Sequence, residues 1–140
     1  MDNLPQRLAD FLSSFQPHDP RTYDDLVTFY AEDMTFIDPI QRLEGRAAFR
    51  AMNERVFGRA AVVRFEEVAV IGAEPRFALT WTMVFRPRIG PEMRVAGVSE
   101  VHSREGLVVF HRDHWDLLGM VMSGFPHLEP IYKKILALMG

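Results

Sequence analysis

The fold is decided by one stretch of the chain, Arg76–Arg86, which reads RFALTWTMVFR. Large apolar side chains occupy every second position from Phe77 to Phe85, among them Trp81 and Met83. Because successive side chains of a strand point to opposite faces, this period of two predicts a β-strand with one bulky face. That face must be buried, so the stretch predicts a sheet that is covered on one side by helices.

The same period of two continues on both sides of this stretch. We expect further strands at residues 62–71, 93–103 and 107–116, with turns at residues 72–75, 87–92 and 104–106. Long consecutive strands joined by short turns are typical of an antiparallel meander.

Helical spacing of apolar residues marks three segments before the meander and one after it. The expected helices lie near residues 4–15, 22–30, 45–57 and 128–139, with Thr22 capping the second, and a short strand is expected at residues 34–38. We therefore expect one α+β domain, residues 1–140, in which a cone-like, curved, mixed but mostly antiparallel sheet wraps around N-terminal helices and is followed by a C-terminal helix.

Composition excludes several classes of function. The net charge is −3 and no run of Lys or Arg occurs, which argues against nucleic acid or a membrane as partner. The absence of cysteine excludes disulfides and thiolate chemistry. No signal peptide is apparent and Leu117–Met122 is too short to cross a bilayer, so we expect a cytoplasmic protein. No glycine-rich phosphate loop occurs, and no cofactor is expected.

The last expected strand ends in the run HRDHWD. Alternation places His111, Asp113 and Trp115 on one face of that strand. The same count adds Val109 to this face and leaves Val108 on the other. Trp115 favours this face as the inner one, because a Trp side chain buries a large area.

An inward Asp113 needs a partner, because burial of an unpaired charge costs several kcal/mol. His111 lies two residues away on the same face, and a His–Asp pair at the wall of a pocket is typical of general acid/base catalysis. Alternatively, both residues make structural hydrogen bonds, for example to a helix cap or to Arg112 of a dimer mate. The residues themselves leave both interpretations open.

Asp38 is a second candidate acid, placed at the end of the short strand by Pro39. It is either a base that projects over the pocket or the side chain of an Asx-turn that accepts backbone N–H groups. The local sequence favours the turn, which is the commoner arrangement.

A polar patch is expected on the outer face of the last two strands, formed by Glu100, His102, His114 and Asp116. A metal site built from the two histidines and a carboxylate is conceivable there. No close spacing of ligands supports it, and we expect no metal.

Two stretches of the chain resemble known proteins. The first half of nuclear transport factor 2-like domains is similar to Tyr30–Pro39, YAEDMTFIDP, followed by Leu43–Gly45, LEG. The last strand of their SnoaL-like, polyketide-cyclase branch resembles Glu105–Asp116, EGLVVFHRDHWD. The resemblance implies a cone-shaped α+β fold with a deep apolar cavity, and often a homodimer formed through the outer face of the sheet.

Three kinds of enzyme with this resemblance imply different roles. Ketosteroid isomerase implies Asp38 as the general base, but its oxyanion donors would fall at Phe11 or Phe15 and at Ser99. Without those donors an enolate loses stabilisation worth several kcal/mol, which weighs against that route.

Limonene epoxide hydrolase implies a role for Asp113, but its partner Arg and Asp would fall near Trp81 and Met83. SnoaL-like cyclases imply Asp113 as the base of an aldol closure, which needs only one base and an apolar slot.

The resemblance also implies that the His111 face lines the cavity. Catalytic roles are expected for Asp113, His111 and Asp38, and ligand contacts for Tyr30, Phe36, Met52, Trp81, Met83, Phe85, Ser99, Val101 and Trp115. We expect a pocket for a bulky apolar or polycyclic molecule, with acid/base chemistry of the isomerase, cyclase or hydrolase type. The alternative is a non-catalytic domain for ligand binding or dimerisation.

Overall fold

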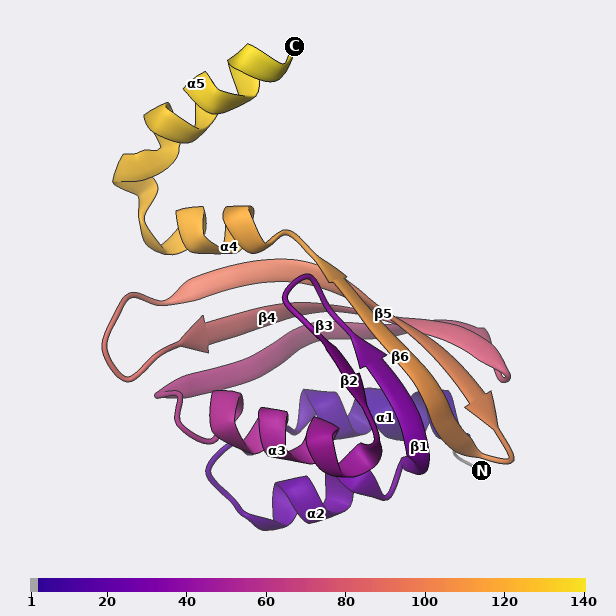
Figure 1. The fold of residues 1–140 in the computed structure, drawn as a ribbon. Helices are drawn as coiled ribbons and strands as arrows, with labels where there is room; N and C mark the ends of the chain where they lie inside the picture. The colour runs from indigo at the N-terminus through magenta and orange to yellow at the C-terminus, as the bar shows by residue number, and fades with distance from the viewer. Residues whose placement is uncertain (1–2) are drawn as a thin grey trace.

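The computed structural model describes residues 3–140. The elements follow one another as α1 (Leu4–Ser13), α2 (Arg21–Val27), β1 (Tyr30–Ile37), β2 (Arg42–Glu44), α3 (Arg46–Phe57), β3 (Val62–Ala73), β4 (Arg76–Arg86), β5 (Met93–Arg104), β6 (Leu107–Trp115), α4 (Leu117–Gly124), a short 3₁₀ turn (Pro126–Leu128) and α5 (Glu129–Met139). Figure 1 shows α1, α2 and α3 gathered on one side of the sheet, α4 directly after the end of β6, and α5 extending away from the rest of the fold.

The sheet has six strands in the order β2-β1-β6-β5-β4-β3. The four long strands form the expected antiparallel meander. β1 joins the meander parallel to β6, and β2 pairs with β1 in antiparallel fashion. The α+β class and the curved, mixed, mostly antiparallel sheet are thereby confirmed.

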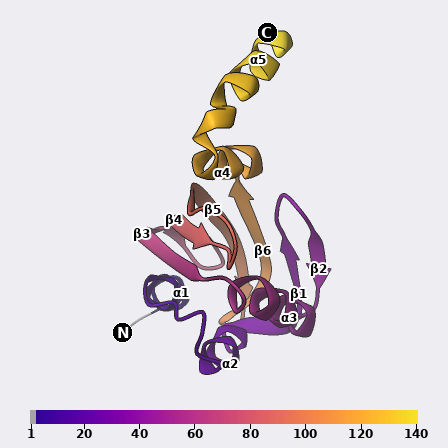
Figure 2. The same ribbon diagram turned by 90° about the vertical axis from the view of Figure 1, so that its left-hand side faces the viewer.

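Irregular positions in the strands bend the sheet. In β3 the register slips between Glu66 and Ala69, opposite Trp81, and Glu67 takes a positive φ of 53°. A bulge of this kind increases the local twist and bends the strand. Figure 2 shows the result, a sheet that arches from β3 to β2 around α1 and α3.

The core lies between this concave face and the helices. α1 packs against β3, and α3 packs against β1. Alternate residues of β4 enter the core as expected: Phe77, Leu79, Trp81 and Met83 are 2–7% exposed. The period of two in β4 therefore identified the inner face of the sheet.

Three expectations about the N-terminal half are corrected. β1 begins at Tyr30 rather than at residue 34, so Tyr30 belongs to a strand and not to the second helix. Thr22 caps no helix: α2 starts at Arg21, and the Thr22 hydroxyl donates instead to the carbonyl oxygen of Gln16 at 2.7 Å. β2 was not expected, because three residues are too few to show a period.

The start of β6 also differs from the simple alternation. The register slips opposite His102 and Ser103, so that Val109 is an extra residue. Val108, which is fully buried, therefore enters the core in place of Val109. Beyond this bulge the alternation resumes in the expected phase.

The C-terminal part contains two helices where one was expected. α4 follows β6 directly; Asp116 caps it by accepting the N–H of Gly119 at 2.9 Å. α5 extends away from the sheet and has no buried residue (Figure 1). None of the helices in the described chain combines the length and apolar composition needed to span a bilayer.

Candidate active site

A cavity of about 310 Å³ lies between the concave face of the sheet and the helices. Its volume is near the lower end of the usual range for small-molecule sites. The wall includes every residue that was selected from the sequence, namely Tyr30, Phe36, Asp38, Met52, Trp81, Met83, Phe85, Ser99, Val101, His111, Asp113 and Trp115. Most of the remaining wall is apolar and comes from α1, α3 and α4.

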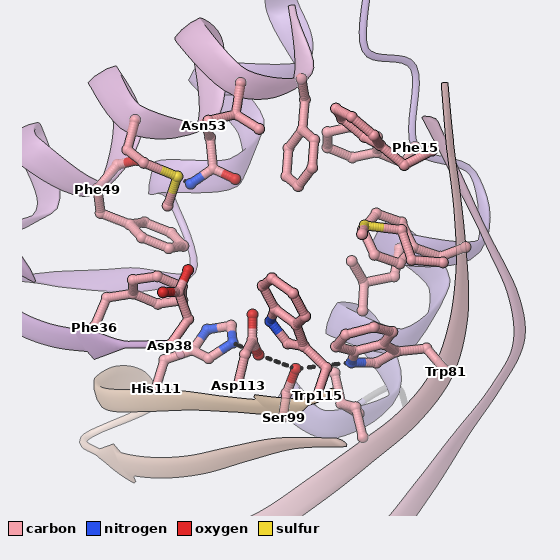
Figure 3. Close-up of a pocket in the computed structure, with 18 of the residues that line it drawn as sticks. Phe15, Phe36, Asp38, Phe49, Asn53, Trp81, Ser99, His111, Asp113 and Trp115 are labelled. Atoms are coloured by element: carbon pink, nitrogen blue, oxygen red, sulfur yellow. Dashed lines mark hydrogen bonds and ion pairs between the residues drawn. The ribbon is translucent and has the colours of Figure 1, made fainter. Parts of the chain in front are cut away.

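A chain of hydrogen bonds runs along the sheet side of the cavity (Figure 3). The indole Nε1–H of Trp81 donates to Ser99 Oγ at 2.9 Å, and Ser99 donates to Asp113 Oδ1 at 2.6 Å. His111 Nε2 lies 2.6 Å from the same Oδ1. The chain ends at Tyr30, whose hydroxyl lies 2.8 Å from His111 Nδ1.

Strand register explains why these residues meet. Ser99 of β5 and Asp113 of β6 are directly paired across two antiparallel strands, where side chains on the same face lie close together. Gly97, two residues before Ser99, provides the space for the Trp81 ring, because a Cβ at this position would collide with it. Trp81 can therefore reach Ser99 across the sheet.

The direction of the bonds follows from the donor and acceptor groups. An indole N–H can only donate, so Ser99 accepts from Trp81 and has its own hydroxyl hydrogen available for Asp113. Asp113 therefore accepts at Oδ1 from Ser99. No hydrogen bond within residues 3–140 involves its second oxygen, Oδ2, and Figure 3 shows that oxygen on the cavity side.

His111 is held from both ends and packed by aromatic rings. Burial, and next the nearby Asp113 carboxylate, raise the pKa of Tyr30 above its ordinary value, so its phenol stays protonated. A phenol that donates to Nδ1 leaves the hydrogen of the imidazole on Nε2, where it donates to Asp113. The rings of Phe36 and Phe49 lie 5.2 and 5.9 Å from the imidazole.

The His111–Asp113 pair is mostly buried but remains partly accessible. The His111 and Asp113 side chains are 13% and 20% exposed. The hydrogen bond from His111 to the Asp113 carboxylate is stronger in such surroundings than at the surface, because less water screens it. A carboxylate with one free oxygen against an apolar cavity can accept a proton from a bound molecule.

Asp38 lies on the cavity wall and also forms the turn that the sequence favoured. Its Oδ1 accepts the backbone N–H groups of Ile40 and Gln41 at 2.8 and 2.9 Å. The side-chain amide of Gln41 donates to Oδ2 at 3.3 Å. Both oxygens of Asp38 therefore have partners, whereas only Oδ1 of Asp113 does among the described residues.

Two polar groups of the wall were not identified as such from the sequence. The indole N–H of Trp115 makes no hydrogen bond among the described residues; the sequence suggested this Trp only as an apolar contact. The second group is the carboxamide of Asn53 on α3, which is 6% exposed. A polar residue amid the apolar stripe of Phe49, Met52 and Phe57 was the available signal for Asn53.

The expected polar patch lies on the outer face of the sheet. Glu100 contacts both histidines, with 3.3 Å to His102 Nε2 and 3.4 Å to His114 Nε2. Asp116 is engaged separately as the cap of α4. Across residues 3–140, no three or more His, Asp or Glu side chains are grouped so as to hold a metal ion.

The comparison with known families is decisive for the class of protein. The family model of the SnoaL-like domain matches residues 8–111. The chain belongs to the SnoaL-like family. No curated protein sequence matches this SnoaL-like chain.

Solved structures share the architecture at low sequence identity. A proposed polyketide cyclase from Pseudomonas putida is 15% identical with a TM-score of 0.73, over 89% of this chain and 99% of that one. A protein with a ketosteroid isomerase-like fold from Catenulispora acidiphila, in complex with trimethylamine, is 14% identical with a TM-score of 0.70, over 86% and 91%. An LEH-like epoxide hydrolase from Mycobacterium tuberculosis is 14% identical with a TM-score of 0.69, over 94% and 96%. Such likeness shows the fold and leaves the reaction to the site.

Proposed function

We propose that this SnoaL-like domain binds a bulky apolar molecule in the cavity and catalyses proton transfer on it without a cofactor. One observation carries the proposal: Oδ1 of Asp113 is occupied by two donors, whereas Oδ2 is free on the side of an apolar cavity. A positioned base of this kind contributes roughly 10²–10⁴-fold to a proton transfer.

The reaction that needs the fewest additional groups is deprotonation next to a carbonyl. Asp113 Oδ2 takes the proton from carbon, the electrons of the C–H bond form a carbon–carbon double bond, and the carbonyl oxygen gains the negative charge. The free indole N–H of Trp115, on the same face of β6, is available to that oxygen. In a substrate with a carbon–carbon double bond beside the deprotonated carbon, return of the proton from Asp113 to the far carbon of that bond completes an isomerisation. In a substrate with a second carbonyl, attack of the enolate carbon on it closes a ring, and the new alkoxide takes the proton back from Asp113.

His111 acts through Asp113. Its Nε2–H bonds to Oδ1 and fixes the carboxylate, while Tyr30 fixes the tautomer of the ring. Tyr30 and His111 are therefore positioning residues. Asp38 has both oxygens engaged, so it forms part of the cavity wall rather than taking the proton.

The same geometry weighs against the other reactions of related folds. The positions expected to supply the partners of an epoxide hydrolase are occupied by Trp81 and Met83, which are not ionisable. The position expected to supply an acidic oxyanion donor is Ser99, whose hydroxyl already donates to Asp113. A domain that binds a ligand without catalysis remains the alternative and is an outcome of the test below.

The test is hydrogen exchange on a bicyclic ketone. We expect the wild-type protein to accelerate the exchange of the α-hydrogens of 2-decalone in D₂O, followed by NMR. Asp113→Asn keeps the size of the side chain but removes the base, so the acceleration should fall by about 100-fold or more.

Asp33→Asn is the matched control, because Asp33 has a side chain 77% exposed outside the cavity and should leave the rate unchanged. Binding of the ketone with no exchange above background would establish the non-catalytic alternative. Equal loss of exchange in both variants would remove Asp113 as the base.

We also propose that the protein forms a homodimer through the outer face of the sheet. Two apolar side chains on that face, Ile71 and Val98, are 59% and 37% exposed. Sedimentation at micromolar concentration should give twice the chain mass of 16.1 kDa. Val98→Glu should shift the species to the monomer, and a wild-type protein that sediments only as a monomer would refute the dimer.

A further inference from the structure

The helix side of the cavity is apolar with one exception. Among the described residues, helices contribute to the wall Leu8, Phe11, Leu12, Leu26, Phe49, Met52, Asn53, Val56, Phe57, Leu117, Met120 and Val121. Asn53 is the polar member of this set. It is also more than nine-tenths buried, with an exposed fraction of 6%.

The local hydrogen bonding determines which atom Asn53 offers to the cavity. Its Nδ2 donates to the carbonyl oxygen of Phe49 at 2.8 Å, one turn earlier in α3. Only an N–H can bond to a carbonyl oxygen, so this contact assigns the two ends of the carboxamide. The carboxamide oxygen accepts no hydrogen bond within residues 3–140. None of the fully buried side-chain polar atoms of these residues lacks a partner, so this oxygen keeps accessible surface, and Asn53 lines the cavity.

The carboxamide and the hydrogen-bonded chain of β6 lie on opposite walls. Figure 3 shows Asn53 on the helix side of the cavity, and His111, Asp113 and Ser99 on the sheet side. Apolar rings, Phe15 and Trp81 among them, line one flank of the cavity. A molecule that fills the space therefore meets a base at one end and a lone acceptor at the other.

We propose that Asn53 is a specificity-determining residue that accepts a hydrogen bond from a hydroxyl group on the substrate, at the end remote from the carbon that Asp113 deprotonates. This inference rests on the proposed function only for the end of the substrate that Asp113 deprotonates; the hydrogen bond to Asn53 does not depend on that reaction. The substrate class is an uncharged, apolar cyclic ketone that carries a distal hydroxyl.

The charge of the wall supports an uncharged substrate. None of the described residues that line the cavity is Lys or Arg, so a carboxylate or phosphate on the ligand would have no cation to pair with. A hydroxyl needs only an acceptor, and the Asn53 oxygen supplies one in a site where the competing water is displaced by the ligand.

The test compares two ligands that differ by one hydroxyl: 2-decalone and 6-hydroxy-2-decalone. The two Trp residues of the chain both line the cavity, so intrinsic tryptophan fluorescence reports binding of either ketone. We expect the wild-type protein to bind the hydroxylated ketone about fivefold to tenfold more tightly, the usual value of one hydrogen bond. Asn53→Leu, similar in size, should abolish this preference while 2-decalone still binds.

The two proposals fail separately. Asp113→Asn should abolish hydrogen exchange but keep the preference for the hydroxyl. A wild-type protein that binds both ketones equally, or neither of them, overturns the role of Asn53 without use of any variant. Loss of the preference in Asn53→Leu with unchanged near-ultraviolet circular dichroism supports it, and a preference that survives in that folded variant also overturns it.

Discussion

On the inner face of β6, His111 and Asp113 lie 2.6 Å apart with side chains 13% and 20% exposed. Near the outer face of the same strand, His114 lies 3.4 Å from Glu100 with side chains 49% and 46% exposed. The residue types are alike on the two faces. The inner pair is enclosed, aligned by Ser99 and Tyr30 and open to an apolar cavity, whereas water screens the outer pair. Enclosure by the fold, rather than the presence of His and an acid, therefore defines the candidate site.

The largest expected difference between the two faces is in activity. His111→Phe retains an aromatic ring among Phe36 and Phe49 but removes the donor to Asp113, so exchange of 2-decalone should slow by about 100-fold. His114→Phe should change the rate by less than about twofold, since it alters only an exposed pair. Similar losses in both variants would contradict the distinction between the faces.

The next effect is on stability and tests how closely the inner face is packed. Gly97→Ala places a methyl group against the Trp81 ring, and overpacking of this kind costs about 1–3 kcal/mol of unfolding free energy. Ala96→Ser, one residue away on the exposed face, should cost less than about 0.5 kcal/mol. Urea unfolding followed by circular dichroism measures both, and equal midpoints would show that the inner face has spare room.

Alkaline pH distinguishes the buried tyrosines. Burial raises the pKa of Tyr30 in the folded state, whereas an unfolded tyrosine titrates near about 10. Below that pH both states are protonated; above it only the unfolded chain loses the proton, so stability falls by up to about 1.4 kcal/mol per pH unit. Tyr30→Phe should reduce this dependence of the unfolding free energy on pH. Urea unfolding over roughly pH 9 to 12, a range that brackets the pKa of an unfolded tyrosine, measures it.

Tyr23 provides the comparison for that slope. Burial, and next the charge of Glu54, raise the pKa of Tyr23 to about 12. The stabilisation that Tyr23 gives by staying protonated in the folded state should therefore be lost mainly between the pKa of an unfolded tyrosine, about 10, and the folded-state pKa. An identical slope in wild type, Tyr23→Phe and Tyr30→Phe would show that neither phenol is held protonated by the fold.

The smallest effect is expected on the outer face. Glu100→Gln removes the charge shared by His102 and His114, and exposed pairs of this kind contribute about 0–1 kcal/mol. The change in unfolding free energy should shrink further in high salt. A larger cost that persists in salt would mean that this face is covered, for example by a second copy of the chain.

Much of the fold could be predicted from local patterns. β4 shows its inner face because Phe77, Trp81 and Met83 alternate with smaller residues over a long strand. α3 lies where Gly45 and Gly58 bound an apolar stripe. Short or context-dependent elements were missed: β2 has three residues, and Tyr30 entered β1 because pairing with β6 overrode its helical spacing.

The candidate site was predictable only in part. Asp113 and His111 were identified because they alternate with Trp115 on one strand, but the free oxygen of Asp113 depends on Ser99 and His111 both donating to the other one. Val108 and Val109 show the limit of counting, because one bulge inverts the faces that alternation assigns.

The sequence alone therefore determined the class of fold, the meander and the inner face of β4, because the spacing of apolar residues is a local property that follows from which side chains are buried. Only the tertiary structure decided which polar atoms meet. The contact of Tyr30 with His111 spans 81 residues, and Asn53 lies across the cavity from Asp113 only because α3 closes the arch of the sheet. Contacts between residues so far apart depend on register, bulges and packing, which no local pattern of residues specifies.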